Sequence, residues 1–272
     1  MDFALPEELQ ILQDTVRKFV DQEMIPVEME CRDGVALKPE YRERFEAKTR
    51  EMGLWMLDVP EEFGGAGLNL MAQVIIWAEV ARTVAVPSRG RSIFGPEVRP
   101  VLYAMNEEQK ERYLYPLLRD EKRACFAQTE PDAGSDPGSM RTRAVRDGDE
   151  YVIDGVKRFI TEADEADFAQ VMVATDPEKG SHGGISCILV DMDNPGVKIT
   201  AKYKTMMGYE PCEIVFDNCR VPAANMIGEE GEGFKLGQKW LGIGRLKHGG
   251  RAIGVAQRAI EMGAQYAKQR VT

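Results

Sequence analysis

The sequence has few of the residues on which many enzyme mechanisms depend. It has 2 His among 272 residues, and neither belongs to an HExxH pattern or to a cluster of metal ligands. The common zinc hydrolase sites are therefore excluded. The sequence also lacks GxSxG, GxxxxGK[ST] and a GxGxxG that follows a strand. A serine-hydrolase elbow, a P-loop and a Rossmann dinucleotide site are not supported.

Long apolar runs and paired cysteines are also missing. The longest apolar stretch, 70–81, contains Gln73 and Glu79 and is shorter than the roughly 20 residues that span a bilayer. The N-terminus, MDFALPEELQ, lacks the basic region of a signal peptide. Five Cys without a CxxC pair indicate a reducing compartment rather than a disulfide framework. We expect a cytoplasmic protein with no membrane partner.

Acidic residues exceed basic ones, 45 to 35, which gives a net charge of −10. This balance argues against a nucleic-acid partner, because phosphate binding needs a basic face. Residues 233–272 are the exception, with eight Lys+Arg and one acid. Such a basic segment suits an anionic ligand such as a phosphate, but on charge alone a solvated face that pairs with acids elsewhere is the favoured interpretation.

Hydrophobic periodicity divides the chain into three parts. Three- and four-residue spacing predicts helices from Leu5 to about Pro26 and over 39–52, 70–84 and 107–118. Short β-rich runs follow, over 151–155, 158–161, 168–175, 184–192, 196–200 and 213–221. A helical stripe returns over 234–266 and ends without a partner for its apolar face, so we expect its mate outside this sequence.

The prediction is therefore an α+β multidomain chain. Residues 1–120 would form an N-terminal all-α helical domain, and 121–232 a central antiparallel β-barrel or sandwich domain. Residues 233–272 would form the start of a C-terminal helical bundle.

The segment CFAQTEPDAGSDPGSM, 125–140, contains several groups suited to a binding loop. Asp132 favours a turn, and Gly134 allows a positive φ or a close backbone approach. Thr129 and Ser135 offer hydroxyls that donate and accept hydrogen bonds, and free N–H groups in such a turn can hold an anion. A Gly-Ser turn alone is equally typical of a hairpin loop.

The complete string resembles the TEP-x-AGSD signature of the acyl-CoA dehydrogenase family, and other segments match the same family in order. DVPEEFGGAGLNL (58–70) with EVAR (79–82) and NEEQKERYLYPLL (106–118) are similar to its N-terminal domain. The stretch 149–167 is similar to its G-x-K-x-[WF]-I-T strand pair, and 216–234 to the end of its β domain. Residues 244–270 resemble the first helices of its C-terminal domain.

The resemblance implies FAD as cofactor and an acyl-CoA thioester as substrate, oxidised to the 2-enoyl-CoA. It also implies an electron-transfer flavoprotein as electron acceptor and a homodimer or homotetramer. The implied flavin contacts are Phe126, Ala127, Gln128, Thr129, Gly134, Ser135, Phe159, Ile160, Thr161 and, from a neighbouring subunit, Arg270. The implied substrate-binding positions are Ser135, Gly244 and Arg245, of which Arg245 would contact the CoA end.

Two positions depart from the family pattern. Glu162 stands where the family often has Asn, which changes the charge beside the flavin site. Gly244 occupies the position at which some subfamilies carry the catalytic Glu, and in most members that residue lies late in the C-terminal domain, a region we expect to be missing here. Three functions stay open: a dehydrogenase, a flavin monooxygenase or oxidase of the same fold, and a fragment that binds FAD or acyl-CoA without turnover.

Overall fold

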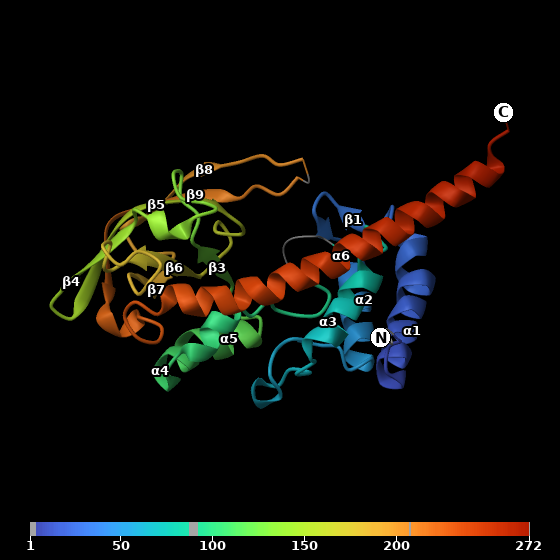
Figure 1. Cartoon of the computed structure of the whole chain (residues 1–272), viewed down its shortest axis with the longest axis horizontal. Coiled ribbons are helices and arrows are strands. Elements are labelled where there is room, and N and C mark those ends of the chain that lie inside the picture. The colour runs from blue at the N-terminus through green and yellow to red at the C-terminus, as the bar shows by residue number, and fades with distance from the viewer. Residues whose placement is uncertain (1–3, 87–91, 207, 272) are drawn as a thin grey trace. The chain divides into compact units, whose positions relative to one another are not determined.

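The computed structural model describes residues 4–86, 92–206 and 208–271, which form two compact units. Unit 1 comprises residues 1–97 and 241–272, and unit 2 comprises residues 98–240. The long helix α6 (Gly233–Gln269) contributes residues to both units. Each unit is described by itself (Figure 1).

Unit 1 is helical, as its periodicity predicts. α1 (Glu7–Phe19) follows Pro6, carries acids in its first turn, and continues through a π-turn over Val20–Met24 and a 3-10 turn over Ile25–Val27. A small hairpin of β1 (Arg32–Asp33) and β2 (Ala36–Leu37) leads to α2 (Pro39–Glu51). A 3-10 turn over Glu61–Phe63 precedes α3 (Leu70–Val80).

α3 is shorter than the predicted 70–84. Asn69 caps its start by accepting a hydrogen bond from the N–H of Ala72 (3.0 Å), and the helix ends at Val80 in a turn. Beyond the end, Glu28 accepts hydrogen bonds from the Thr83 hydroxyl and the Val84 N–H, which fixes the turn. These contacts come from a distant part of the chain and therefore leave no local pattern.

The interior of unit 1 combines an apolar core with a buried ionic network. The core includes Phe45, Ile76 and Trp77, while Glu79 is 2% exposed and accepts hydrogen bonds from Arg17 and Gln13 at 2.7 and 2.9 Å. Arg82 pairs with Glu79, Asp21 and Glu261, the last from α6. The network joins α1, α3 and α6, so a buried carboxylate is compensated by two guanidinium groups.

The later part of α6 packs directly on α3 (Figure 1). A Cβ atom built on Gly254 would lie 1.9 Å from the carbonyl oxygen of Ala78, and one on Gly250 would lie 2.7 Å from that of Val74. The two helices therefore need glycine at these positions. Several large apolar side chains on the same stretch stay exposed, as the unpartnered stripe predicts: Leu246, Ile253, Val255, Ile260, Met262 and Tyr266.

Unit 2 begins with a 3-10 turn over Pro100–Ala104 and the predicted 107–118 helix. This helix comprises α4 (Glu107–Gln109), a π-turn over Lys110–Leu114, and α5 (Tyr115–Leu118). Its start is closed by a capping box in which the side chains of Asn106 and Gln109 each accept from the other's backbone N–H. The first strand, β3 (Ala124–Ala127), follows five residues after the helix.

A seven-stranded sheet forms most of unit 2. Its other strands are β4 (Arg143–Asp147), β5 (Glu150–Ile160), β6 (Phe168–Ala174), β7 (Ile185–Asp191), β8 (Val197–Lys202) and β9 (Cys212–Pro222). A short 3-10 turn over Ala223–Asn225 then leads toward α6. The strand order is β3-β6-β4-β5-β9-β8, with β7 paired to β6.

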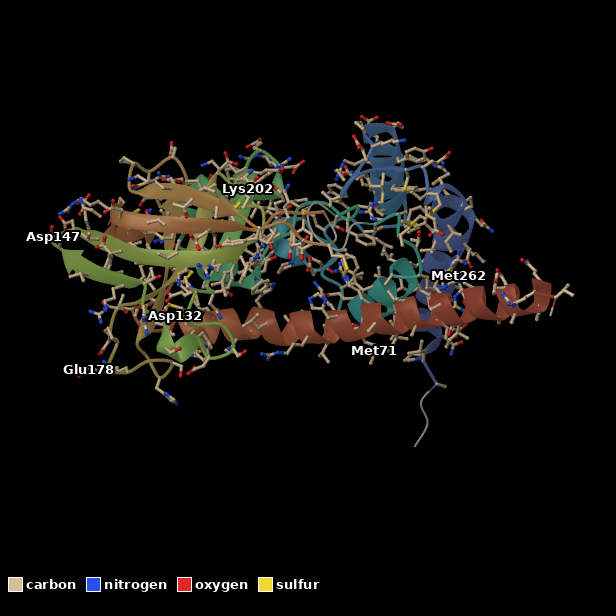
Figure 2. The ribbon with its side chains drawn as sticks, turned by 90° about the horizontal axis from the view of Figure 1, so that it is seen from above. Met71, Asp132, Asp147, Glu178, Lys202 and Met262 are labelled. Atoms are coloured by element: carbon tan, nitrogen blue, oxygen red, sulfur yellow. The ribbon has the colours of Figure 1, made fainter. Side chains whose placement is uncertain are left out.

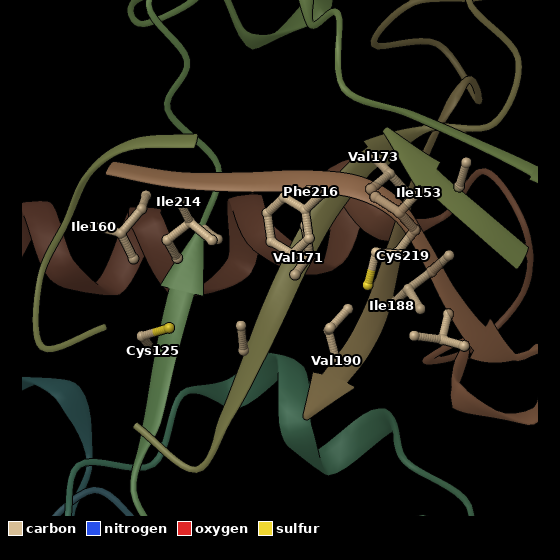
Figure 3. Close-up of a cluster of buried hydrophobic side chains, with 14 of the residues drawn as sticks. Cys125, Ile153, Ile160, Val171, Val173, Ile188, Val190, Ile214, Phe216 and Cys219 are labelled. Carbon is tan, nitrogen blue, oxygen red and sulfur yellow. The ribbon is translucent and has the colours of Figure 1, made fainter. Parts of the chain in front are cut away.

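Most pairs in this sheet are antiparallel, as predicted, but β6 pairs parallel with β3 and, at one position, with β4. Side chains from β3, β5, β6, β7 and β9 meet in a single core that includes Cys125, Ile153, Val171, Ile188 and Phe216 (Figure 3). The sheet is therefore curled around its own core, consistent with the predicted barrel or sandwich. Among the described residues, no helix combines the length and apolar content that crossing a bilayer requires.

Candidate functional site

The candidate site lies where β3 ends and where β5 ends, two segments about thirty residues apart in sequence. The backbone N–H of Arg158, on β5, donates to the carbonyl oxygen of Thr129, just after β3, at 2.8 Å. The side chain of Lys157 donates to the neighbouring carbonyl oxygen of Gln128 at 3.0 Å. The structure thus brings together two segments that sequence analysis assigns to the flavin, 126–129 and 159–161.

A buried ion pair lies directly behind this junction. Lys157 is fully buried and Glu130 is 6% exposed, and the Lys157 Nζ lies 2.8 Å from a carboxylate oxygen of Glu130. Burial lowers the pKa of Lys157 to about 8, against the opposing effect of Glu130. Burial alone would raise the pKa of Glu130, but Lys157 and hydrogen bonds from Thr142 and Arg141 lower it instead. The carboxylate therefore stays ionised.

The end of β5 is irregular, and the irregularity turns an aromatic ring outward. The β5–β9 register shifts between Lys157 and Ile160, as in a bulge, and Phe159 has φ = +60°. Phe159 is 55% exposed, whereas Ile160 is buried. A left-handed conformation is unusual for a bulky residue and is typical of binding sites, where the surrounding structure holds the strain.

A second aromatic ring supports Phe159 from behind. The Tyr203 ring lies 4.9 Å from that of Phe159 at an interplanar angle of 59°. The Tyr203 hydroxyl donates to Glu213, which also accepts from the Arg158 guanidinium and the Thr200 hydroxyl. The hydrogen bonds from Tyr203 and Arg158 lower the pKa of Glu213. The Phe159 ring therefore has an aromatic neighbour and still exposes about half of its surface.

The hydroxyls assigned to the flavin have no hydrogen-bond partner among the described residues. Over the part of the chain that the structure describes, Thr129, Ser135 and Thr161 make no side-chain hydrogen bond, and Ser135 is exposed. Gly134 does not use the positive φ that the sequence allows, and a Cβ there would meet nothing within 4 Å. Of the two roles that the sequence allows for Gly134, the structure does not use the positive φ, and the open space at this glycine leaves its backbone accessible to a close approach.

The first turns of α6 cover the outer face of β3. The Phe126 and Trp240 rings lie 4.8 Å apart, and a Cβ on Gly237 would lie 3.7 Å from Phe126 and 3.8 Å from Gln128 Oε1. Gln128 Oε1 is buried and has no hydrogen-bond partner among the described atoms. Ala127 points to the opposite face, into the core of the sheet. Of the assigned β3 residues, Ala127 can therefore offer a ligand only its backbone.

The remaining assigned residues lie on the later part of α6, in unit 1. Gly244 is half-buried with open space at its Cβ, and Arg245 is exposed. The guanidinium of Arg270, just after the helix, donates to the Tyr266 hydroxyl at 3.3 Å. Their substrate and cofactor contacts stay predictions.

Sequence analysis missed Lys157, Glu130, Tyr203, Glu213 and Trp240 as parts of this region. Lys157 and Glu130 do stand inside the quoted motifs, G-x-K and TEP, which could have drawn attention to them. Tyr203, Glu213 and Trp240 carry no local signal, because their roles depend on contacts with distant strands.

The residues present fit a flavin, which has flat apolar faces and a polar edge. Phe159 offers an outward aromatic ring for a face, and Thr129, Ser135 and Thr161 offer unpartnered hydroxyls for an edge. Across residues 4–86, 92–206 and 208–271, no three His, Cys, Asp or Glu side chains gather as metal ligands. The exposed Phe159 ring and the three hydroxyls suit an organic cofactor held by ring contacts and hydrogen bonds.

Comparisons with known proteins agree with this geometry. The family pattern "Acyl-CoA dehydrogenase, N-terminal domain" matches residues 6–121, and "Acyl-CoA dehydrogenase, middle domain" matches residues 125–219. The chain is 36% identical to an acryloyl-CoA reductase (NADH) of Anaerotignum propionicum, covering 100% of this chain and 68% of that protein. It is 35% identical to an acyl-CoA dehydrogenase of Bacillus subtilis, covering 97% and 69%.

Solved structures show the same architecture. Butyryl-CoA dehydrogenase from Megasphaera elsdenii matches with a TM-score of 0.76 and 30% identity, covering 100% of this chain and 72% of that chain. The fold consists of a helical unit and a curled-sheet unit. The chain belongs to the acyl-CoA dehydrogenase family. The members of this family are FAD-dependent oxidoreductases.

The chain spans between 64% and 71% of the length of the curated relatives reported for it. Those relatives therefore contain residues that have no counterpart in the given sequence. For this chain, the activity, substrates and partners of the relatives are therefore proposals.

Proposed function

We propose that this chain holds FAD at the β3–β5 junction for the α,β-dehydrogenation of an acyl-CoA thioester. Electrons would pass on to an electron-transfer flavoprotein. One observation carries the proposal: Arg158 N–H donates to Thr129 O and Lys157 Nζ to Gln128 O, which places segment 126–129 beside the two residues that directly precede the other assigned segment, 159–161. Family membership supplies the chemistry, in which bound FAD accepts a hydride from the β carbon of the thioester.

The residues of this chain would bind and orient rather than transfer the proton. Phe159, held from behind by Tyr203, would cover one face of the flavin and keep water from it. Thr129 and Thr161 would donate to its polar edge, and Ser135 to its phosphate or to the acyl-CoA. Gly244 supplies no carboxylate at the position that carries the catalytic base in some subfamilies.

The test is an anaerobic visible spectrum of the protein supplied with FAD, recorded before and after adding a panel of acyl-CoA thioesters. A flavin band that bleaches with one thioester supports the dehydrogenase and identifies the substrate class. A protein that retains no flavin contradicts the proposal. A bound flavin that never bleaches moves support to a binding role or, if an oxygen adduct forms in air, to a monooxygenase or oxidase.

The serine hydroxyl gives a second test. Ser135→Ala removes a donor that has no acceptor in the part of the chain that the structure describes, so the fold should be unaffected. A hydrogen bond to a charged group is worth about 1.5–3 kcal/mol, and FAD or acyl-CoA affinity should fall accordingly. Unchanged affinity for both ligands would remove Ser135 from the site.

A second candidate function is the reverse reaction, reduction of a 2-enoyl-CoA. It is favoured by the relatives themselves, because the chain is as similar to an acryloyl-CoA reductase (NADH) as to an acyl-CoA dehydrogenase. The same contacts would orient the thioester in either direction. NADH distinguishes the two, because the reductase relative is named for it: consumption of NADH on adding a 2-enoyl-CoA supports the reductase, and bleaching of the flavin band by a saturated acyl-CoA without NADH consumption supports the dehydrogenase.

A further inference from the structure

Burial of the charged pair Lys157 and Glu130 costs desolvation free energy. The Lys157 side chain is 0% exposed and that of Glu130 is 3% exposed, so both charges are removed from water. Desolvation of two charges offsets much of their attraction, and apolar replacement of a buried pair is often neutral or stabilising. Stability of the sheet alone is therefore a weak reason for this pair.

The hydrogen bonds around the pair indicate what it does. Glu130 accepts from the N–H of Arg141 at 2.6 Å and from the N–H of Thr142 at 3.0 Å. It therefore joins the two ends of loop 131–140, which carries Gly134 and Ser135. Lys157 adds the bond to Gln128 O, at the exit of β3.

The same lysine also lies at the start of the β5 bulge. Phe159 follows two residues later and turns outward at positive φ. One ammonium group therefore contacts the β3 exit and the residue that closes loop 131–140, and it stands on the strand that presents Phe159. A methionine or leucine at position 157 could fill the volume but could not donate to Gln128 O or to Glu130.

We propose that Lys157 and Glu130 are positioning residues that hold loop 131–140, the β3 exit and the β5 bulge in the geometry that receives FAD. This inference rests on the proposed function. According to this inference, the pair increases the affinity for FAD and restricts the motion of the bound flavin. It contributes little to the stability of the sheet.

The test compares the wild-type chain with the double variant Lys157→Met/Glu130→Gln. This variant removes both charges, leaves no unpaired ion in the interior, and keeps an amide oxygen for one of the two N–H groups. Three quantities are measured: the Kd for FAD by quenching of flavin fluorescence, the fine structure of the visible flavin band, and the urea midpoint without FAD. We expect the Kd to rise at least tenfold, about 1.4 kcal/mol, with a broadened band, and the urea midpoint to fall only by the effect of the one backbone N–H that loses its acceptor.

A matched control uses an ion pair at the other end of the same strand. Arg220 pairs with Glu150, on β5, and with Asp147, at the tip of β4 (Figure 2). Arg220→Met/Glu150→Gln removes that pair and should leave the Kd and the flavin band unchanged. An equal loss of affinity in the control would overturn the assignment, because it would show a general effect of sheet charge.

The outcomes separate this inference from the proposed function. Failure of the wild-type chain to bind FAD refutes the proposed function. Tight binding by the wild type together with an unchanged Kd and band in Lys157→Met/Glu130→Gln refutes the positioning role. If that variant does not fold, Lys157→Leu/Glu130→Gln, which also removes the donor toward Gln128 O, undergoes the same measurements with the same criteria.

Discussion

Alanine at position 254 should separate α6 from α3. The Cβ of Gly254→Ala would lie 1.9 Å from the carbonyl oxygen of Ala78, whereas carbon and oxygen atoms in contact lie about 3.3–3.6 Å apart. The variant must therefore shift one helix by about 1.4 Å or more. Gly249→Ala is the matched control, because a Cβ there meets nothing within 4 Å.

Three contributions set the expected difference in the free energy of unfolding between the two variants. Both alanines gain about 1 kcal/mol of helix propensity over glycine. Only Gly254→Ala overpacks the helix contact, at a cost of about 1–3 kcal/mol. The shift would also stretch the Arg82–Glu261 and Arg258–Glu28 pairs, each 3.3 Å long and partly buried, which adds about 1 kcal/mol. Gly254→Ala should therefore be less stable than Gly249→Ala by about 2–4 kcal/mol.

Tryptophan fluorescence in urea measures this difference. Of the 3 Trp, Trp55 and Trp77 lie in unit 1, so a Trp240→Phe background reports on that unit alone. Trp77 is well placed, because the Arg251 guanidinium lies 4.0 Å from the centre of its ring. If Gly254→Ala raises the midpoint as much as Gly249→Ala, α6 does not pack on α3 in solution and the reasoning is refuted.

Three further predictions concern unit 2 and the ligands. Burial raises the pKa of the Cys125 and Cys187 thiols to about 12, and all five Cys are buried; a thiol reagent should therefore react only after unfolding, and fast labelling of the native protein would contradict this burial. The pKa of Lys157 is about 8 when folded and about 10.4 when unfolded, so between these values the unfolded state binds more protons. The free energy of unfolding should accordingly rise with pH from about 8 to 10, by up to about 3 kcal/mol, and this slope, measured by urea unfolding, should vanish in Lys157→Met/Glu130→Gln. Arg245→Ala should weaken acyl-CoA binding more than FAD binding in calorimetric titrations, and the opposite order would assign this arginine to the cofactor.

The helices and most strands of this chain follow from local pattern. Amphipathic spacing predicted α1, α2 and α3, and β-rich runs predicted β5, β6, β7, β8 and β9. The prediction lacked β3 and β4. β4 has mostly exposed side chains, and β3 pairs parallel with a strand forty residues later. The alternation of polar and apolar residues does not reveal a mostly polar strand such as β4. It also does not reveal which strand pairs with β3, or in which direction.

The sequence motifs predicted which segments form the candidate site. They did not predict the buried contacts that hold these segments in place. The TEP and I-T segments drew attention to Thr129, Ser135 and Phe159, and the structure brings the segments together. The burial of Lys157 could not be predicted, because a lysine in a strand is ordinarily exposed. Its burial depends on Glu130, which lies 27 residues away.

The division of unit 1 between the two ends of the sequence has a consequence for synthesis on the ribosome. Its first 97 residues emerge early, but the glycines that fit against α3 and the Glu261 that pairs with Arg82 emerge only after the whole of unit 2. At about 5–20 residues per second, this delay is on the order of ten seconds. During that interval the nascent helices carry an uncovered apolar surface and an incompletely paired Arg82. Pulse-labelled nascent chains halted at residue 240 should therefore be cut by protease near α3.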